Sequence, residues 1–195
     1  AAAVKSLERT VSGLLIFARP RQLSLESVCL REMVDDLVEI TRQDLAQRRA
    51  EDVRIEVEYG HEPNLIGADG DQLRRAILNL MRNACEAMPR GGRLGVRTRI
   101  GPPRPGQAGN HVEIQVSDTG EGIPPEVGAK LFQPFVSSKA GGVGLGLAIV
   151  QKVAELHRGE VLWNSTPGEG TTFTLRIPLR QPTGDTASAQ KTPNR

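Results

Sequence analysis

The sequence predicts an α+β fold in which helices cover one face of a mixed β-sheet, giving a two-layer sandwich. Several segments alternate apolar and polar residues, as strands with one face toward solvent do. A few longer segments place apolar residues at helical spacing, which predicts helices mixed with the strands. Stretches rich in glycine and proline separate these segments and are typical of hairpin loops.

The bulk composition indicates one full domain plus an appendage and argues against two classes of partner. The 195 residues carry 25 Lys and Arg against 23 Asp and Glu. The net charge of +2 is too small to favour nucleic acid or an anionic membrane as a partner. Aromatic residues make up only 3%, which also argues against a protein that stacks nucleic-acid bases. Cys29 and Cys85 fit no metal or redox spacing and indicate reduced thiols in a cytoplasmic setting. The apolar runs are too short for a membrane span, and no signal peptide is visible.

The first twenty residues predict a separate helix, and their start indicates a piece of a longer protein. Its apolar residues are spaced alternately three and four apart, as in a heptad seam: Val4, Leu7, Val11, Leu14 and Ala18. Pro20 ends this helix because proline cannot continue the hydrogen-bond pattern. The helix either packs against other helices in a bundle or docks on its own domain, and its residues do not distinguish the two.

The middle of the chain predicts strands and helices in alternation. They are a strand at 25–30, a helix at 34–45, strands at 53–59 and 65–68, a helix at 71–88 and a strand at 94–100. We expect Asp71 to cap the second of these helices and Gly91 and Gly92 to follow its end. The core face of that helix is predicted to hold Leu73, Ile77, Leu80, Ala84 and Met88.

The last part of the chain predicts three strands and one helix around an irregular, glycine-rich region. A hairpin loop at 101–110 precedes a strand at 112–116, and the irregular region then extends to about Gly144. A helix at 145–156 and strands at 161–163 and 173–177 follow. The polar tail after Pro178 is expected to be disordered because it has too few apolar residues to bury.

Asn79 and Asn83 lie four residues apart in a predicted helix and therefore share one of its faces. Asparagine is a poor residue for a helix interior because its amide competes for backbone hydrogen bonds. This face borders the buried stripe, so both amides could line a cleft, where an amide oxygen suits Mg²⁺. The alternative is a pair of surface amides.

Asp118, Gly120 and Gly122 follow directly after a predicted strand. A carboxylate at a strand end can accept a hydrogen bond from an exocyclic amine such as that of adenine. The two glycines let backbone and ligand approach closely. The alternative is a tight turn in which Asp118 is an Asx-turn residue.

Phe132 and Phe135 flank Pro134 in the irregular region and could anchor one end of a lid. Lys139 follows in the same segment and could reach a phosphate as a point charge. The alternative is a surface loop held by apolar side chains, with a solvated lysine.

Gly141, Gly142, Gly144 and Gly146 lead into the helix predicted at 145–156. Exposed backbone N–H groups at the positive end of a helix dipole make an anion site suited to phosphates. The spacing does not match the dinucleotide fingerprint, which would need glycine where Leu147 stands, and no Walker-type Gly-Lys-Ser/Thr is present. The alternative is a flexible hinge.

In this order and spacing, the four features resemble the N, G1, F and G2 boxes of the GHKL (Bergerat) ATPase superfamily. The superfamily comprises histidine kinases, type II topoisomerases, a class of heat-shock chaperones and MutL mismatch-repair proteins. Within it the chain looks most like sensor histidine kinases of the nitrogen-regulation type. The similar segments are 7–20, 78–88, 118–124, 131–139, 142–150 and 168–173.

The resemblance implies three parts of the chain. Residues 1–20 correspond to the C-terminal part of the dimerisation and phosphoacceptor helix, and 21–180 to an ATP-binding catalytic domain. Residues 181–195 fall outside the resemblance and remain the predicted disordered tail.

The resemblance also implies which residues handle Mg²⁺ and the phosphates of ATP. Asn83 would bind the Mg²⁺ that bridges the phosphates. Asn79 would be a catalytic residue that helps to orient the attacking group or the metal. Arg82 and Lys139 would contact phosphates.

At the adenine end, the resemblance implies that Asp118 recognises the amino group and that Thr171 supports Asp118 through a shared hydrogen bond. Thr171 is in phase with Phe173, so we expect it to point inward. The other residues implied to bind ATP are Glu86, Ala87, Gly120, Gly122, Ile123, Gly142, Gly144, Leu145, Gly146 and Leu147.

One departure from the family limits the expected activity. The family's phosphoacceptor lies in a helical motif that begins His-Glu or His-Asp, and none of His61, His111 and His157 lies in such a helix. The phosphoryl acceptor would therefore be a histidine absent from this chain. We expect ATP and Mg²⁺ binding with slow hydrolysis at most, and no autophosphorylation by this chain alone.

Other functions stay open beside that of a histidine kinase. An anti-sigma-type serine kinase shares the ATP-binding fold, although the helix at 7–20 favours the histidine kinase. A nucleotide-gated conformational module is less favoured, because its topoisomerase and MutL members carry a glutamate base where Asn79 stands. A degenerate binding scaffold is disfavoured, because Asn83, Asp118 and the lid glycines are all present.

The histidine kinase resemblance implies two partners, a response regulator receiver domain and the phosphoacceptor helix of the full-length kinase. It implies a homodimer for the intact protein. We expect no nucleic acid, no membrane contact by this part of the protein and a cytoplasmic location. Membrane attachment of the intact protein stays open.

Overall fold

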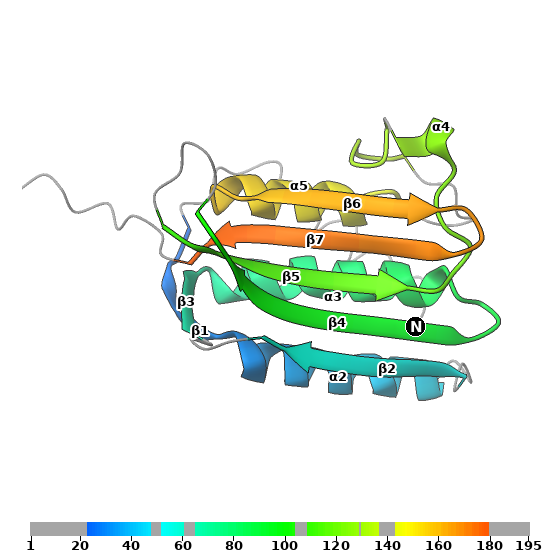
Figure 1. Ribbon diagram of the computed structural model, residues 1–195, viewed down its shortest axis with the longest axis horizontal. Coiled ribbons are helices and arrows are strands. Elements are labelled where there is room, and N and C mark those ends of the chain that lie inside the picture. Colours follow the sequence, from blue (N-terminus) through cyan, green and yellow to red (C-terminus); the bar gives the residue numbers. More distant parts are fainter. Residues whose placement is uncertain are drawn as a thin grey trace, which may run out of the picture.

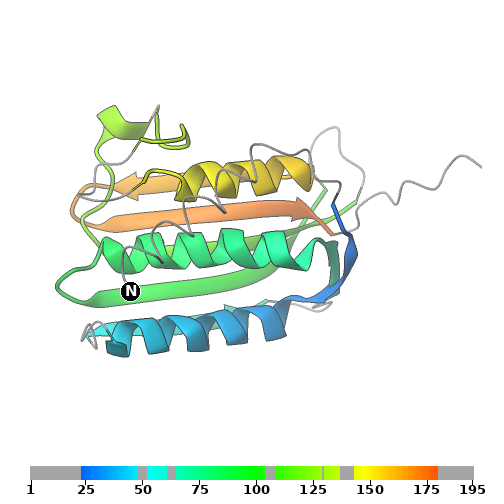
Figure 2. The same cartoon turned by 180° about the vertical axis from the view of Figure 1, so that it is seen from behind.

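The computed structural model describes residues 23–47, 52–60, 65–103, 109–128, 130–136 and 143–179. The elements are β1 (Glu26–Cys29), α2 (Leu30–Gln47), β2 (Val53–Tyr59), β3 (Leu65–Ala68), α3 (Gly70–Glu86), β4 (Gly92–Gly101), β5 (His111–Asp118), α4 (Pro125–Gly128), α5 (Gly146–Leu156), β6 (Glu160–Thr166) and β7 (Gly170–Pro178). One layer is a five-stranded sheet in the order β2-β4-β5-β7-β6 (Figure 1). The other layer consists of α2, α3 and α5, which lie on one face of that sheet (Figure 2). The predicted two-layer α+β fold is confirmed.

The main sheet is mixed because one pair of strands runs parallel and the others antiparallel. β2 pairs with β4 in parallel, from Val53 opposite Gly92 to Tyr59 opposite Thr98. A parallel pair needs a long crossover connection, which β3 and α3 supply here. β4 with β5, β5 with β7 and β6 with β7 are antiparallel. The β4–β5 pair confirms the predicted hairpin, although residues 104–108 of its loop lie outside the described residues.

β1 and β3 form a separate two-stranded antiparallel sheet and do not extend the main one. Glu26 pairs with Ala68 and Cys29 pairs with Leu65. Each strand runs directly, or almost directly, into a helix, since α2 starts at Leu30 and α3 at Gly70. This small sheet therefore fixes the starts of α2 and α3 beside each other.

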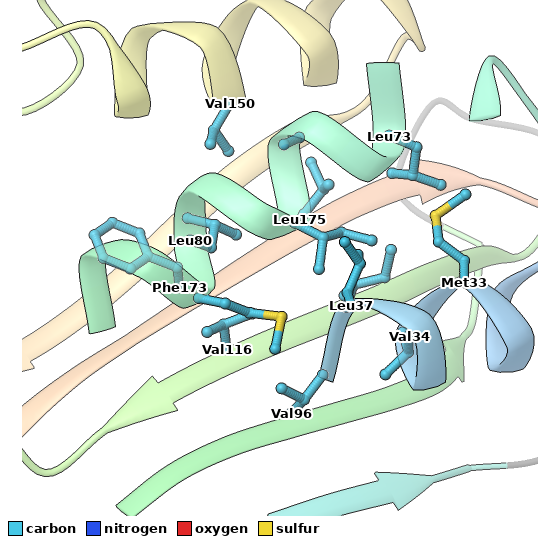
Figure 3. Close-up of a cluster of buried hydrophobic side chains, with 14 of the residues drawn as sticks. Met33, Val34, Leu37, Leu73, Leu80, Val96, Val116, Val150, Phe173 and Leu175 are labelled. Carbon is cyan, nitrogen blue, oxygen red and sulfur yellow. The ribbon is translucent and has the colours of Figure 1, made fainter. Parts of the chain in front are cut away.

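The core lies between the main sheet and the helices, with helical and strand side chains interleaved (Figure 3). Leu37, Leu73 and Leu80 are 0% exposed, and each stabilises the fold by about 1.5–3 kcal/mol on full burial. In α2 the buried residues recur three and four apart, as the predicted helical stripe requires. The buried side chains labelled in the close-up are Met33, Val34, Leu37, Leu73, Leu80, Val96, Val116, Val150, Phe173 and Leu175.

The N-cap of α3 is Asp69, so the prediction of Asp71 was wrong. A cap residue needs extended backbone, and Asp69 has φ −80° and ψ 103°. Its Oδ1 accepts a hydrogen bond from the backbone N–H of Gln72 at 3.1 Å. Asp71 lies within the first turn, where a carboxylate interacts favourably with the positive end of the helix dipole.

His157 joins the end of α5 to the start of α3. Its ring is 0% exposed, and its Nε2 accepts a hydrogen bond from the backbone N–H of Asp69 at 3.0 Å. Nδ1 lies 2.8 Å from the Val153 carbonyl oxygen and donates to it, which leaves the ring neutral. Burial lowers the pKa of His157, while the Val153 carbonyl and Asp69 act in the opposite direction.

The sheet face opposite the helices carries charged residues. Glu160, Arg176, Glu113 and Arg99 lie opposite one another on four adjacent strands, with alternating charge. The 3%-exposed Glu113 accepts hydrogen bonds from Arg99 and, at 2.7 Å, from Nε of Arg176. Burial raises the pKa of Glu113, but hydrogen bonds from His111 and Arg99 and the charge of Arg176 hold it below its usual value. Among the described residues no helix packs on this face, which agrees with its polar character.

The helix predicted at 1–20 and the tail predicted at 181–195 lie outside the described residues. The region predicted to be irregular before Gly144 contains one short helix, α4. Within the part of the chain that the structure describes, none of the helices combines the length and apolarity needed to cross a membrane.

Candidate functional site

Residues far apart in the sequence meet where α3 and β5 end and where α5 and β7 begin. The backbone N–H of Glu121, just after β5, donates to the carbonyl of Ala87, just after α3, at 3.2 Å. The backbone N–H of Thr171 in β7 donates to the Asp118 carboxylate at the end of β5. Gly146 at the start of α5 faces side chains near the end of α3. The fold thus brings the predicted features to one end of the sandwich.

Asn79 and Asn83 lie together on the face of α3 that meets the start of α5. Both side chains are half-buried. A Cβ added at Gly146 would lie 3.8 Å from Oδ1 of Asn79 and 3.8 Å from both Oδ1 and Nδ2 of Asn83. The N-cap of α5 is Leu145, whose side chain makes no capping hydrogen bond. The first backbone N–H groups of α5, which have no intrahelical partners, therefore lie beside two amides.

Asp118, the last residue of β5, is held in one orientation at the edge of the core. It is 8% exposed, and its Oδ1 accepts hydrogen bonds from the backbone N–H of Gly120 at 2.9 Å and of Thr171 at 3.3 Å. Thr171 is buried, as its phase in the strand predicts. Thr171 donates to Asp118 through its backbone N–H. The hydroxyl of Thr171 lies 2.9 Å from Oγ of Ser165. The hydrogen bond from the Gly120 N–H makes Asp118 an Asx-turn residue, which was the alternative interpretation of this motif. An Asx turn is compatible with ligand recognition by the same carboxylate.

The loop at 119–123 passes closely between the end of α3 and the β6–β7 turn. A Cβ at Gly120 would lie 2.4 Å from the Ala87 carbonyl oxygen. Gly122 has φ +72°, and a Cβ there would lie 2.4 Å from the Thr166 carbonyl oxygen. Both positions therefore require glycine. Ile123 follows, half-buried against the core.

Of the predicted lid, only the two ends are described. Lys139 and Gly142 lie outside the described residues. The ends are joined, because the backbone N–H of Phe135 donates to the Gly144 carbonyl at 2.9 Å. Phe132 packs against the core, but Phe135 is 63% exposed. Phe132 therefore attaches this end of the segment to the core and Phe135 does not, while the lid itself stays a prediction.

Arg82 and Glu86 occupy the outer side of α3. Nε of Arg82 lies 3.8 Å from Oδ2 of Asp44 in α2, so this side chain is directed toward α2. Glu86 is exposed, and Leu147 is half-buried against the core. The structure thus brings Asn79, Asn83 and Gly146 together and places Arg82 about 100° around the helix from Asn83.

Ser165 was not among the predicted site residues, and its hydroxyl lies between β6, β7 and the 119–123 loop. A signal was present in the sequence. Ser165 is in phase with Val161 and Trp163 on the helix-facing side of β6, where a hydroxyl needs hydrogen-bond partners.

The donor set suits an ion that takes few protein ligands. Among the described residues, no group of three or more His, Cys, Asp or Glu side chains could hold a metal. One amide oxygen of Asn83 beside an uncapped helix start fits Mg²⁺, which keeps several waters and binds substrate phosphates. The residues present therefore fit a magnesium-bound phosphate chain better than a metal held by protein alone.

This arrangement and the mixed sheet with helices on one face define a GHKL-type ATPase domain. Residues 68–181 match the family of histidine kinase-, DNA gyrase B- and HSP90-like ATPases. The chain belongs to this family.

Several similar proteins are sensor histidine kinases. ZraS of Klebsiella oxytoca is 37% identical over 176 residues, which cover 89% of this chain and 36% of that protein. The mycobacterial sensor histidine kinase MprB matches with a TM-score of 0.66 at 33% identity, over 80% of this chain and 99% of that one. Full-length ShkA, solved in complex with AMPPNP, matches with a TM-score of 0.68 at 29% identity, over 88% of this chain and 35% of that one. The chain spans about a third of the length of the curated relatives ZraS and AtoS.

Proposed function

We propose that this chain is the ATP-binding catalytic domain of a two-component sensor histidine kinase. It binds ATP with Mg²⁺ and supplies the γ-phosphoryl group to a histidine on another segment of the intact kinase. The membership of the ATPase family and the similarity to sensor histidine kinases support this proposal. The AMPPNP complex of the similar protein ShkA supports an adenine nucleotide as ligand.

The observation that carries the proposal is the fixed carboxylate of Asp118. Two backbone N–H groups hold Oδ1 and fix the orientation of the carboxylate. In this orientation Asp118 can present an oxygen to the exocyclic amine of adenine. The glycines at 120 and 122 let the loop backbone pass beside the base.

The phosphate end of the ligand would lie between α3 and α5. Phosphoryl transfer needs charge neutralisation and an aligned acceptor more than covalent chemistry by the protein. The start of α5 places backbone N–H groups where phosphate oxygens can accept from them. Asn83 would contribute an amide oxygen to Mg²⁺, which neutralises phosphate charge when bound, and Asn79 would orient the attacking group or the metal. Lys139, Gly142 and Arg82 would add phosphate contacts, Arg82 by leaving Asp44.

The acceptor histidine and the remaining partners belong to the intact protein. His111 and His157 are 6% and 0% exposed, so neither can approach a bound nucleotide without unfolding of its surroundings. The proposal includes a phosphoacceptor helix, a homodimer of the intact kinase and a response regulator receiver domain. It also includes a cytoplasmic location for this domain.

The proposal is tested by calorimetric titration of the 195-residue chain with MgADP. The parent is expected to bind, and Asp118→Asn is expected to bind at least tenfold more weakly, because an amide nitrogen replaces one acceptor oxygen. Asp36→Asn is the matched control, since Asp36 lies in α2 and pairs with Arg74 away from the site. Its affinity should equal that of the parent. Equal affinity in parent and Asp118→Asn, or no binding by the folded parent, would contradict the proposal.

A further inference from the structure

The Ser165 hydroxyl has hydrogen-bond partners on three sides. Its Oγ accepts from the backbone N–H of Ile123 at 2.8 Å and donates to the Gly170 carbonyl at 3.0 Å. Oγ1 of Thr171 lies 2.9 Å away. A hydroxyl has one proton and two acceptor positions. Because the proton points to Gly170, the Thr171 hydroxyl donates to Ser165, and every hydrogen-bonding position of Ser165 is filled.

These contacts connect Ser165 both to the 119–123 loop and to the residue that orients Asp118. Ile123 ends the loop that starts after Asp118, so the Ile123 contact holds the far end of that loop. Thr171 also donates its backbone N–H to Oδ1 of Asp118 at 3.3 Å. One hydroxyl in β6 therefore links the loop backbone with the residue that orients the Asp118 carboxylate.

The β6–β7 turn holds the same loop from the same side. The backbone N–H of Gly168 donates to the Glu121 carbonyl at 2.8 Å. The backbone at Gly122 lies so close to Thr166 that a Cβ would reach 2.4 Å from its carbonyl oxygen. On the opposite side, the backbone N–H of Glu121 bonds to Ala87. The loop is thus clamped between α3 and the β6–β7 hairpin, and Ser165 adds a side-chain bond to this clamp.

We propose that Ser165 is a positioning residue for adenine recognition. It fixes the 119–123 loop relative to Asp118, beside which adenine is proposed to bind. This role rests on the proposed function, in which Asp118 recognises adenine. Ser165 acts through Ile123 and Thr171 and is not expected to touch the nucleotide.

Replacing the hydroxyl tests this role. Ser165→Ala leaves the Ile123 N–H, the Gly170 carbonyl and the Thr171 hydroxyl without this partner. Ser165→Thr keeps a hydroxyl and adds a methyl group that a strand position tolerates. Ser117→Ala is the matched control, because Ser117 lies on the opposite face of the sheet, where its hydroxyl is 3.5 Å from the Gly95 carbonyl.

Two measurements separate positioning from general stability. MgADP affinity is measured by calorimetry, and amide hydrogen exchange is measured for residues 119–123 and for α5. Ser165→Ala should bind MgADP at least fivefold more weakly and exchange faster at 119–123, with α5 unchanged. Ser165→Thr and Ser117→Ala should bind within twofold of the parent. If Ser165→Ala does not fold, Ser165→Cys replaces it, since its thiol is a weak hydrogen-bonding group of similar size.

The outcomes distinguish this inference from the proposed function. If Asp118→Asn loses MgADP binding but Ser165→Ala, or Ser165→Cys in its place, binds within twofold of the parent, the role of Ser165 is overturned and the proposed function stands. If Ser165→Ala exchanges faster in α5 as much as in 119–123, the residue has a general structural role and the inference is also overturned. If Asp118→Asn binds like the parent, the proposed function itself fails.

Discussion

At the scale of the residue, a side chain at Gly146 would be compatible with the fold but would obstruct the proposed ligand. It is the first residue of α5 and faces Asn79 and Asn83 across a gap of ordinary van der Waals size. A methyl group at 3.8 Å from these amides would fit the protein without a clash. It would also occupy the space between the helix start and the amides, where we propose that magnesium-bound phosphates lie.

We therefore predict that Gly146→Ala weakens MgADP binding at least tenfold, or by about 1.4 kcal/mol. Its free energy of unfolding should be unchanged or higher by up to ~1 kcal/mol, because alanine is the better helix former. Urea unfolding and calorimetric titration of the same preparation measure the two effects.

Gly70→Ala is the matched control for this prediction. Gly70 is the first residue of α3, and an added Cβ would meet chiefly the flexible end of Glu26. MgADP affinity should therefore equal that of the parent. An unchanged affinity in Gly146→Ala would show that the ligand does not approach the start of α5.

At the scale of the element, α3 and α5 form an antiparallel pair that is held at both ends. The end of α5 bonds to the start of α3 through His157 and Asp69. The start of α5 lies against Asn79 and Asn83 near the end of α3. The His157 contact thus helps to set the register of the two helices that carry the proposed phosphate site.

We predict that His157 makes stability depend on pH below about 6.5. Its pKa is lowered in the folded protein, so between the folded pKa and the unfolded value of about 6.5 the unfolded chain binds the additional proton. The contribution of neutral His157 is therefore complete above pH 6.5 and is lost as the pH falls toward the folded pKa. The slope for this one group is at most about 1.4 kcal/mol per pH unit.

The measurement compares urea unfolding of the parent and of His157→Gln between pH 7.5 and 5.5. At pH 7.5 the variant should be less stable by about 1–3 kcal/mol, because the contact with the Asp69 N–H is disturbed. The difference between the two proteins should shrink as the pH falls, since glutamine does not titrate. Parallel stability curves across this range would show that His157 keeps an ordinary pKa in the folded state.

At the scale of the whole molecule, the proposed nucleotide site lies at one end of the sandwich, and the residues that the structure describes include no accessible histidine. His111 lies on the charged face of the sheet beside Glu113, and His157 lies in the core. In-line phosphoryl transfer needs an acceptor at the γ-phosphate. Under the proposed function, the acceptor histidine therefore belongs to another segment or another molecule.

We predict that the 195-residue chain, incubated with Mg²⁺ and ATP labelled at the γ-phosphate, gains no alkali-stable phosphohistidine. When the phosphoacceptor helical domain of the intact kinase is added as a separate polypeptide, the label should appear on that polypeptide. Asp118→Asn should abolish this transfer. Stable label on His61, His111 or His157 of the chain would contradict the prediction.

The sequence by itself determined the local elements and the chemistry of the motifs. Alternation along 53–59 and the 3.6-residue spacing in α2 located strand and helix correctly, because these periods follow from backbone geometry alone. The residue types around Asn83, Asp118 and Gly146 were enough to suggest a nucleotide site. Such patterns are local, so a single sequence displays them.

Only the tertiary structure decided which distant groups meet. It paired β1 with β3, directed Arg82 toward Asp44 and brought Ser165 to the backbone of Ile123. The partners in the Arg82–Asp44 and Ser165–Ile123 contacts are 38 and 42 residues apart in the sequence, so the packing of distant segments decides whether they meet. A hydrogen bond in a packed interior forms only where the fold places both partners side by side. A local sequence pattern describes one of these partners and does not show which distant group it meets.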